Sequence, residues 1–290
     1  MTTATDLIAE EADRFADALR GPDPSAPVPT CPDWTVEDLL WHLTEVHEFW
    51  AGILKDHALT DADVEAVEAA KAPRPEGSGA RLELLERRER ATAALIDQLT
   101  ARGDTEDAWS WFSADQTVGF TRRMQVHEAG IHRVDAELSA NLPVTAISPE
   151  VAADGLDHAV AVMWAGSYDW VPDWAQTEQL ATLTLAPEDA DPLEVVIERW
   201  WGTRPRDGEE FSQLLARPAK GHDDADVESS SHTTSLPHAT ARGRALALLL
   251  WVWGREHALD RMTDGALTVD LSGDEEAVGH VRGRVAQGMD

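Results

Sequence analysis

A capped amphipathic helix in the first fifty residues is the feature that most constrains how this chain folds. The stretch PDWTVEDLLWHLTEVHEFWAGILKDH follows GPDPSAPVP, whose prolines and glycine exclude a helix. Thr35 and Asp38 have the spacing of a capping box. The apolar residues that follow recur at helical spacing: Leu39, Leu40, Leu43, Val46, Trp50 and Ile53. A helix that begins at Thr35 and buries one face is therefore predicted.

The rest of the first half also has the pattern of helices separated by breakers. Helices are predicted over residues 5–20 and 80–99, over the segment RRMQVHEAGIHRVDAEL, and from the second capping signal in SPEVAADGLDHAVAVMWAG. An acidic loop containing proline and glycine, ending in KAPRPEGSG, is predicted between the helix that begins at Thr35 and the helix over 80–99. Residues 1–172 are therefore predicted to form an antiparallel helical bundle.

The pattern changes near YDWVPDWAQTEQ, and strands become the better interpretation. QLATLTLAP, LEVVIERWW and TVDLSGD alternate as strands do, and helices are expected at about 244–256 and 274–287. Residues 205–235 are polar and are predicted to be a loop that leads into a strand within HTTSLPHATARG. A length of 290 residues favours two domains. Residues 173–290 are therefore predicted to form a smaller α+β domain.

Charge and cysteine content limit the possible partners and compartment. The formal charge of −30, from 54 acidic and 24 basic residues, opposes binding to nucleic acid or anionic lipid, so a small molecule is the expected partner. The N-terminus lacks the pattern of a signal peptide, and the longest apolar run, ALALLLWVWG, is about half of what a bilayer span requires. Cys31 is the only cysteine, which suits a reducing compartment. A cytoplasmic location is expected.

The segment HEAGIH nearly matches the zinc-protease pattern H-E-x-x-H but has one residue too many. His127 and His132 are five positions apart, which is about 140° around a helix, so they do not share a face. Glu128 and His132 are four apart and diverge by only about 40°, so their side chains point the same way. The pair therefore has the geometry of two metal ligands, or of an ordinary polar pair on a solvated face.

A third ligand has to come from another helix, and His42 is the leading candidate. It lies between Leu39 and Val46 on the apolar stripe of the helix that begins at Thr35. One histidine from one helix and a Glu-xxx-His pair from another leave open positions, as in catalytic metal sites. A histidine on an apolar face is, however, often a buried residue without a metal. The residues alone leave both interpretations open.

Neighbouring residues suggest supporting roles. Asp135, one turn after His132, is placed to accept a hydrogen bond from the imidazole and fix its tautomer, although a surface or capping role fits equally. Arg133 is placed to hold an acidic side chain of the bundle in an ion pair. His47 and His127 are not expected to be ligands.

Two motifs together resemble a known family. CPDWTVEDLLWHL and HEAGIHRVDAE are similar to the mycothiol-dependent maleylpyruvate isomerase family, part of the wider DinB-like metalloenzyme group. ATARGRALALLLWVWGRE resembles the second domain of that family, which has a sterol-carrier-like α+β fold. The resemblance implies a DinB-like four-helix bundle whose divalent metal, usually zinc, is bound by His42, Glu128 and His132.

The resemblance also implies an activity. Members use mycothiol as a thiol cosubstrate, either for cis–trans isomerisation of maleylpyruvate or for S-transfer onto another electrophile. A protein that keeps the metal but only binds a small ligand is the alternative from another class. The family points to a second-domain arginine that holds substrate carboxylates. Arg242 and Arg255 flank the apolar helix and are the candidates, although both also fit solvent-facing caps.

Overall fold

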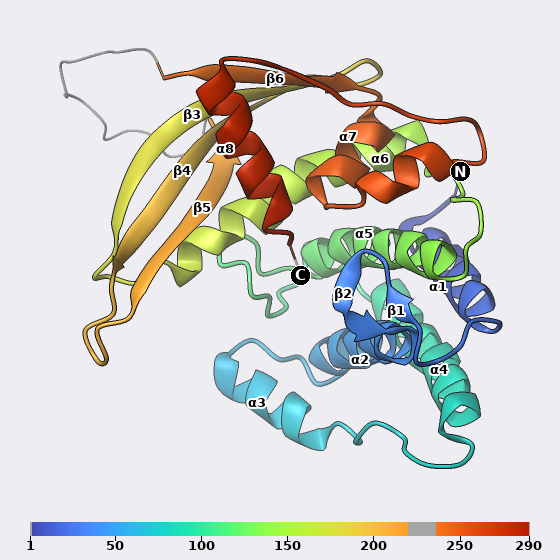
Figure 1. The fold of residues 1–290 in the computed structure, drawn as a ribbon. Coiled ribbons are helices and arrows are strands. Elements are labelled where there is room, and N and C mark those ends of the chain that lie inside the picture. The colour runs from blue at the N-terminus through green and yellow to red at the C-terminus, as the bar shows by residue number, and fades with distance from the viewer. Residues whose placement is uncertain (1, 220–235, 290) are drawn as a thin grey trace. The chain divides into compact units, whose positions relative to one another are not determined.

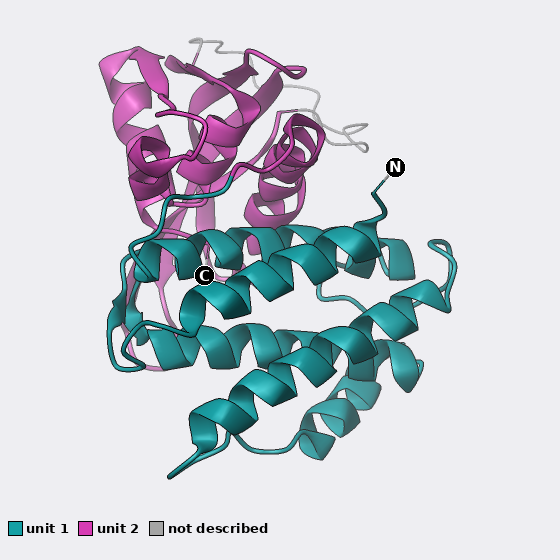
Figure 2. Ribbon diagram, turned by 90° about the vertical axis from the view of Figure 1, so that its right-hand side faces the viewer, with its two compact units in different colours: residues 1–145 teal, residues 146–290 magenta. Residues whose placement is uncertain are grey.

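The computed structural model describes residues 2–219 and 236–289. Contacts within the chain divide it into two compact units, residues 1–145 and 146–290 (Figure 2). Among the described residues, no helix combines the length and the apolar character that crossing a membrane requires. The fold of each unit is considered by itself.

The first unit is helical, with one short hairpin (Figure 1). Its elements in chain order are α1 (Ala4–Leu19), β1 (Pro27–Val28), β2 (Cys31–Thr35), α2 (Val36–Lys55), α3 (Asp61–Ala70), α4 (Ala80–Thr100) and α5 (Val118–Ser139). The predicted helix beginning at Thr35 is confirmed. The Thr35 side chain accepts a hydrogen bond from the backbone N–H of Asp38, whose carboxylate accepts one from the backbone N–H of Thr35.

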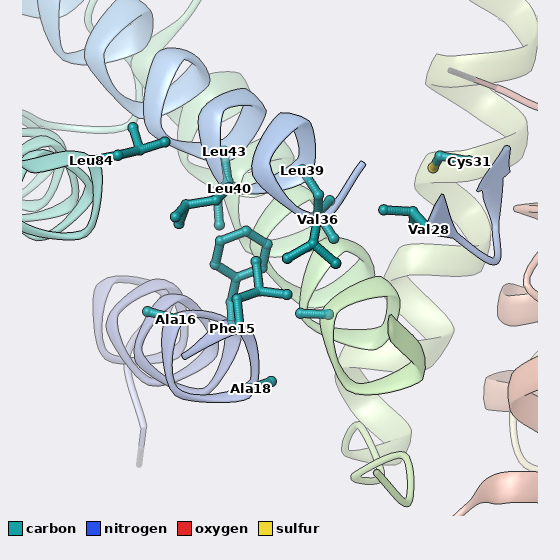
Figure 3. Packing of buried hydrophobic residues seen from close by; sticks show 12 residues of the cluster. Phe15, Ala16, Ala18, Val28, Cys31, Val36, Leu39, Leu40, Leu43 and Leu84 are labelled. Atoms are coloured by element: carbon teal, nitrogen blue, oxygen red, sulfur yellow. The ribbon is translucent and has the colours of Figure 1, made fainter. Parts of the chain in front are cut away.

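Apolar faces of α1, α2, α4 and α5 meet in the core of the first unit. Phe15 of α1 points toward Leu40 of α2 at its centre, as Figure 3 shows, and both are fully buried. The apolar residues predicted along α2 lie in this interior, except Val46, which is half-buried. Burial of such side chains contributes about 1.5–3 kcal/mol each, so the helical spacing read from the sequence is what holds the bundle together.

The helix directions differ in part from the predicted antiparallel bundle. Arg81 near the start of α4 contacts Glu37 near the start of α2, at 2.5 Å. Farther along both helices, Arg87 contacts Glu48 at 2.6 Å. The residue numbers of the contacting pairs increase along both helices, so α2 and α4 run in the same direction. The long connection that contains α3 carries the chain back and makes this parallel pairing possible.

The second unit packs helices with a mixed sheet of five strands in its described part (Figure 1). The strand order is β5-β4-β3-β6-β7, with β3 and β6 parallel and the other pairs antiparallel. Its elements are α6 (Pro149–His158), a π-helical turn (Ala159–Trp164), a 3-10 turn (Ser167–Trp170), β3 (Gln176–Pro187), β4 (Leu193–Thr203), β5 (Glu210–Pro218), β6 (His238–Gly243), α7 (Ala245–Val252), a 3-10 turn (Glu256–Arg261), β7 (Asp270–Gly273) and α8 (Glu275–Ala286). The expectation of a helical part followed by an α+β part is confirmed.

Three local predictions need correction. The segment predicted as an acidic loop contains α3, which is capped by Thr60 and Asp63 and has one buried residue, Val67. The polar loop predicted over 205–235 contains β5, which lies at the edge of the described sheet and whose two buried residues, Leu215 and Ala216, are adjacent and not alternating; residues 220–235 lie outside the described part. The contact boundary falls at Thr145, not at 172, because α6 packs on α7.

Candidate metal centre

Two helices bring His42, Glu128 and His132 together in the first unit, and we call these residues the His-Glu-His cluster. His42 lies on α2, and the other two lie one turn apart on α5. The His42 Nε2 atom is 3.0 Å from Glu128 Oε1, and the His132 Nε2 atom is 3.2 Å from the same oxygen. One ligand atom from each residue lies within 4.8 Å of the others. The predicted triad therefore converges on one point.

Asp135 fixes the orientation of His132, as expected from its position one turn later. Its Oδ2 atom lies 2.9 Å from His132 Nδ1, and its Oδ1 atom accepts a hydrogen bond of 2.5 Å from the Thr30 hydroxyl. Asp135 is fully buried, so this contact is not a surface one. A carboxylate behind a histidine ligand sets the tautomer and raises the basicity of the other nitrogen.

The hydrogen bonds of the cluster are chemically suited to a cation. If His132 donates its Nδ1 proton to Asp135, its Nε2 lone pair faces a Glu128 oxygen that also carries lone pairs. Two such acceptors at 3.2 Å repel unless a proton or a metal ion lies between them. The donor set is also appropriate, because two imidazoles and one carboxylate form a set used by catalytic zinc sites.

Without a metal, a proton takes the place of the cation. Burial alone would lower the pKa of His132, but the charge of Glu128 and the hydrogen bonds to Asp135 and Glu128 raise it to about 10. Burial likewise opposes the ionisation of Glu128, whereas both neighbouring histidines hold the pKa of its carboxyl well below the usual range. The cluster thus concentrates a buried negative charge that attracts a cation.

One side of the cluster is accessible. The side chain of His132 is 4% exposed, whereas those of Glu128 and His42 are 17% and 31% exposed. The Trp34 ring packs against His42, with ring centroids 4.6 Å apart, and lies 6.1 Å from the ring of His132. The cluster therefore has the Trp34 ring beside it and two partly exposed side chains, Glu128 and His42.

Sequence reasoning missed Trp34 and Thr30 as neighbours of the cluster. Both precede α2, in a segment whose main sequence signal is only the absence of a helix. Trp34 stands inside the quoted motif CPDWT, but one tryptophan among twelve carries no positional signal of its own. The β1–β2 hairpin places these two residues beside α5, and no local pattern predicts that contact.

The structure also shows where Arg133, His127 and His47 lie. Arg133 is fully buried and forms ion pairs with Glu11 and Glu137, at 2.6 and 2.7 Å, as predicted for a side chain that holds bundle carboxylates. His127 and His47 are buried but do not belong to the cluster.

The two candidate substrate arginines differ from each other. Arg242 lies on β6 and is exposed. Arg255 is 1% exposed, and its guanidinium donates to the carbonyl of Trp253 at 2.6 Å. A solvent-facing cap is therefore wrong for Arg255, whose side chain is buried. The role of both arginines in substrate binding stays a prediction.

Two imidazoles and a carboxylate from two helices of the first unit form a group that could hold a metal ion. Residues 5–137 match the family model described as the mycothiol maleylpyruvate isomerase N-terminal domain, so this part of the chain is similar to that domain. All three residues of the His-Glu-His cluster lie inside the match. The sterol-carrier-like nature of the second unit stays a prediction. Comparison with curated proteins and with solved structures gave no match.

Proposed function

We propose that this chain is a divalent-metal-dependent enzyme that uses mycothiol as its thiol cosubstrate and isomerises a maleylpyruvate-like substrate from cis to trans. The observation that carries this proposal is the convergence of His42, Glu128 and His132 inside a part of the chain that is similar to the mycothiol maleylpyruvate isomerase N-terminal domain. The donor set favours zinc. Small molecules are the partners in this proposal, and the charge of −30 is consistent with that and with a cytoplasmic protein.

In this proposal the cluster residues bind and orient, and the thiol comes from the cosubstrate. When bound, a divalent ion supplies a Lewis acid that lowers the pKa of a thiol at its open position. His42, Glu128 and His132 would hold the ion, while Asp135 keeps the His132 ring in place. Cys31 is the only cysteine and is buried in the apolar core, so the chain does not offer it as a nucleophile.

The isomerisation needs no net redox change. The thiolate forms a C–S bond to an alkene carbon, and the electron pair of the double bond moves into the adjacent carbonyl as an enolate. Rotation about the resulting single bond follows. The enolate then reforms the double bond, the C–S bond breaks, and the thiolate leaves unchanged.

The decisive experiment incubates metal-loaded protein with mycothiol and maleylpyruvate. We expect the substrate to be converted to its trans isomer only when both the metal and the thiol are present. Absorbance and mass spectrometry measure this conversion. A stable S-conjugate in place of the isomer would identify an S-transferase. Intact substrate together with bound thiol would identify a ligand-binding protein, and either result contradicts isomerisation.

Changing Asp135 to Asn tests the orienting contact behind the cluster. The amide keeps the size of the carboxylate but loses its charge, so His132 becomes less basic and its ring less firmly held. We expect the affinity for Zn²⁺ to fall about 10- to 100-fold, measured by competition with a chromogenic chelator. Ser139→Ala on the same helix is the control. Equal affinities in the Asp135→Asn protein and the control protein would exclude the orienting role.

A further inference from the structure

The face of α5 that carries the His-Glu-His cluster continues inward as a stripe of buried polar residues. At about 100° per residue, Thr121, Gln125, Glu128 and His132 fall within an arc of about 60°. Thr121 and Gln125 are fully buried. Among the described residues, the Thr121 hydroxyl and both polar ends of the Gln125 amide have no hydrogen-bond partner.

His47 of α2 adds a buried lone pair to this region. The Thr92 hydroxyl donates its hydrogen to the carbonyl of Arg88 at 3.0 Å, so the Thr92 oxygen accepts the hydrogen bond that joins it to His47 Nδ1 at 2.9 Å. His47 is therefore the Nδ1–H tautomer, and its Nε2 atom is an acceptor. That atom is buried and also lacks a partner within the described chain.

His47 lies level with the buried end of the stripe. Thr30, which precedes α2, contacts Asp135, and His42 of α2 contacts Glu128, so the contacts move back along α5 as the chain advances into α2. Five residues beyond His42 correspond to about 7.5 Å along α2. The same distance along α5, counted from Glu128 toward its N-terminus, reaches the helical turn between Thr121 and Gln125. The charge of Glu128 acts on the His47 ring, which agrees with its being nearby.

Such a group of unsatisfied atoms is unusual in an interior. Buried polar groups are nearly always hydrogen-bonded, because leaving them unpaired destabilises the folded state. Leucine or methionine at position 125 would avoid this cost. Gln125 offers a donor and an acceptor side by side, and His47 offers a neutral acceptor; none of these side chains carries a charge that would favour a carboxylate. The complementary group is an amide.

We propose that Thr121, Gln125 and His47 form a polar subsite that binds an uncharged amide of the thiol cosubstrate while its sulfur lies at the His-Glu-His cluster. This inference rests on the proposed function and specifies which thiols the site accepts. The subsite selects thiols by the amide that follows the sulfur, and it disfavours apolar thiols of the same length because they leave the buried groups unpaired.

The test compares two small thiols, N-acetylcysteamine and 1-pentanethiol, on zinc-loaded protein by titration calorimetry. Wild-type protein is expected to bind the amide thiol at least about tenfold more tightly, which is the effect of one or two hydrogen bonds. In the Gln125→Met protein, we expect this preference to disappear while the zinc content stays unchanged. Gln98→Met is the matched control, because that half-buried amide already accepts a hydrogen bond from Arg102 near the end of α4.

Thermal unfolding without ligand gives an independent readout. Gln125→Met removes an amide that has no partner, so the unfolding midpoint should rise, by about 2 °C. A lower midpoint would show that the protein or its bound water satisfies the amide, and would overturn the subsite. Equal binding of both thiols by the wild type would also overturn it and leave the proposed function standing. Binding of neither thiol would contradict the proposed function and this inference together.

Discussion

The His132→Ala protein is expected to retain less than about a tenth of the divalent metal that the wild type retains, because one of the three proposed protein ligands is lost. His132 is also the most buried member of the cluster, so a water molecule cannot replace its nitrogen without opening the core. Metal analysis after purification without chelators measures this loss directly. His42→Ala and Glu128→Gln should have the same effect, since each removes one ligand.

A histidine outside the cluster provides the control. His57 lies in the same unit, is exposed, and has a φ of 51°, a backbone conformation that asparagine tolerates well. His57→Asn should therefore keep the full metal content, about one ion per chain. Unchanged metal in the His132→Ala protein, or equal loss in both variants, would show that the ion is not held by the cluster.

Replacing Arg133 with Met should destabilise the first unit by about 3 kcal/mol or more. The guanidinium lies between Glu11 of α1 and Glu137 of α5, and it also donates to the carbonyl of Thr145 at 2.7 Å. Methionine fills much of the volume but leaves two carboxylates facing each other in the interior. Urea titration followed by circular dichroism measures the change in the free energy of unfolding.

An exposed pair of similar chemistry is the control for this prediction. Arg14 contacts Glu10 at 2.6 Å, but both side chains are largely exposed. Arg14→Met should change the free energy of unfolding by less than about 1 kcal/mol. If Arg133→Met lowers the free energy of unfolding no more than Arg14→Met does, the buried ion pairs do not hold α1 against α5. The double variant Arg133→Met/Glu137→Met should lose less stability than the sum of the losses in the two single variants.

Much of the helical architecture could be predicted because its signals are local. The cap at Thr35 and the apolar spacing of α2 act within a few residues, so the sequence predicts where this helix begins and which face is buried. The sequence signals failed for elements that are stabilised by contacts with distant parts of the chain. β5 lies at the edge of the described sheet and pairs with β4, and its own residues do not alternate between buried and exposed.

One part of the candidate site could likewise be predicted from the sequence, and another part could not. Helix geometry alone places Glu128 and His132 on one face and moves His127 off it. The same geometry extends the face to Gln125, but it does not reveal that the Gln125 amide lacks a partner among the described residues. Whether His42 comes within 3.0 Å of Glu128 depends on how α2 packs against α5.

The sequence by itself determined most of the helices, the change to strands, the spacing of the Glu128–His132 pair and the family resemblance, because these depend on neighbouring residues and short motifs. The tertiary structure alone decided that His42 comes within 3.0 Å of Glu128, that Trp34 packs against His42, and that α2 and α4 are parallel. Such contacts join residues that are far apart in the chain, and they form only when several helices bury their apolar faces together.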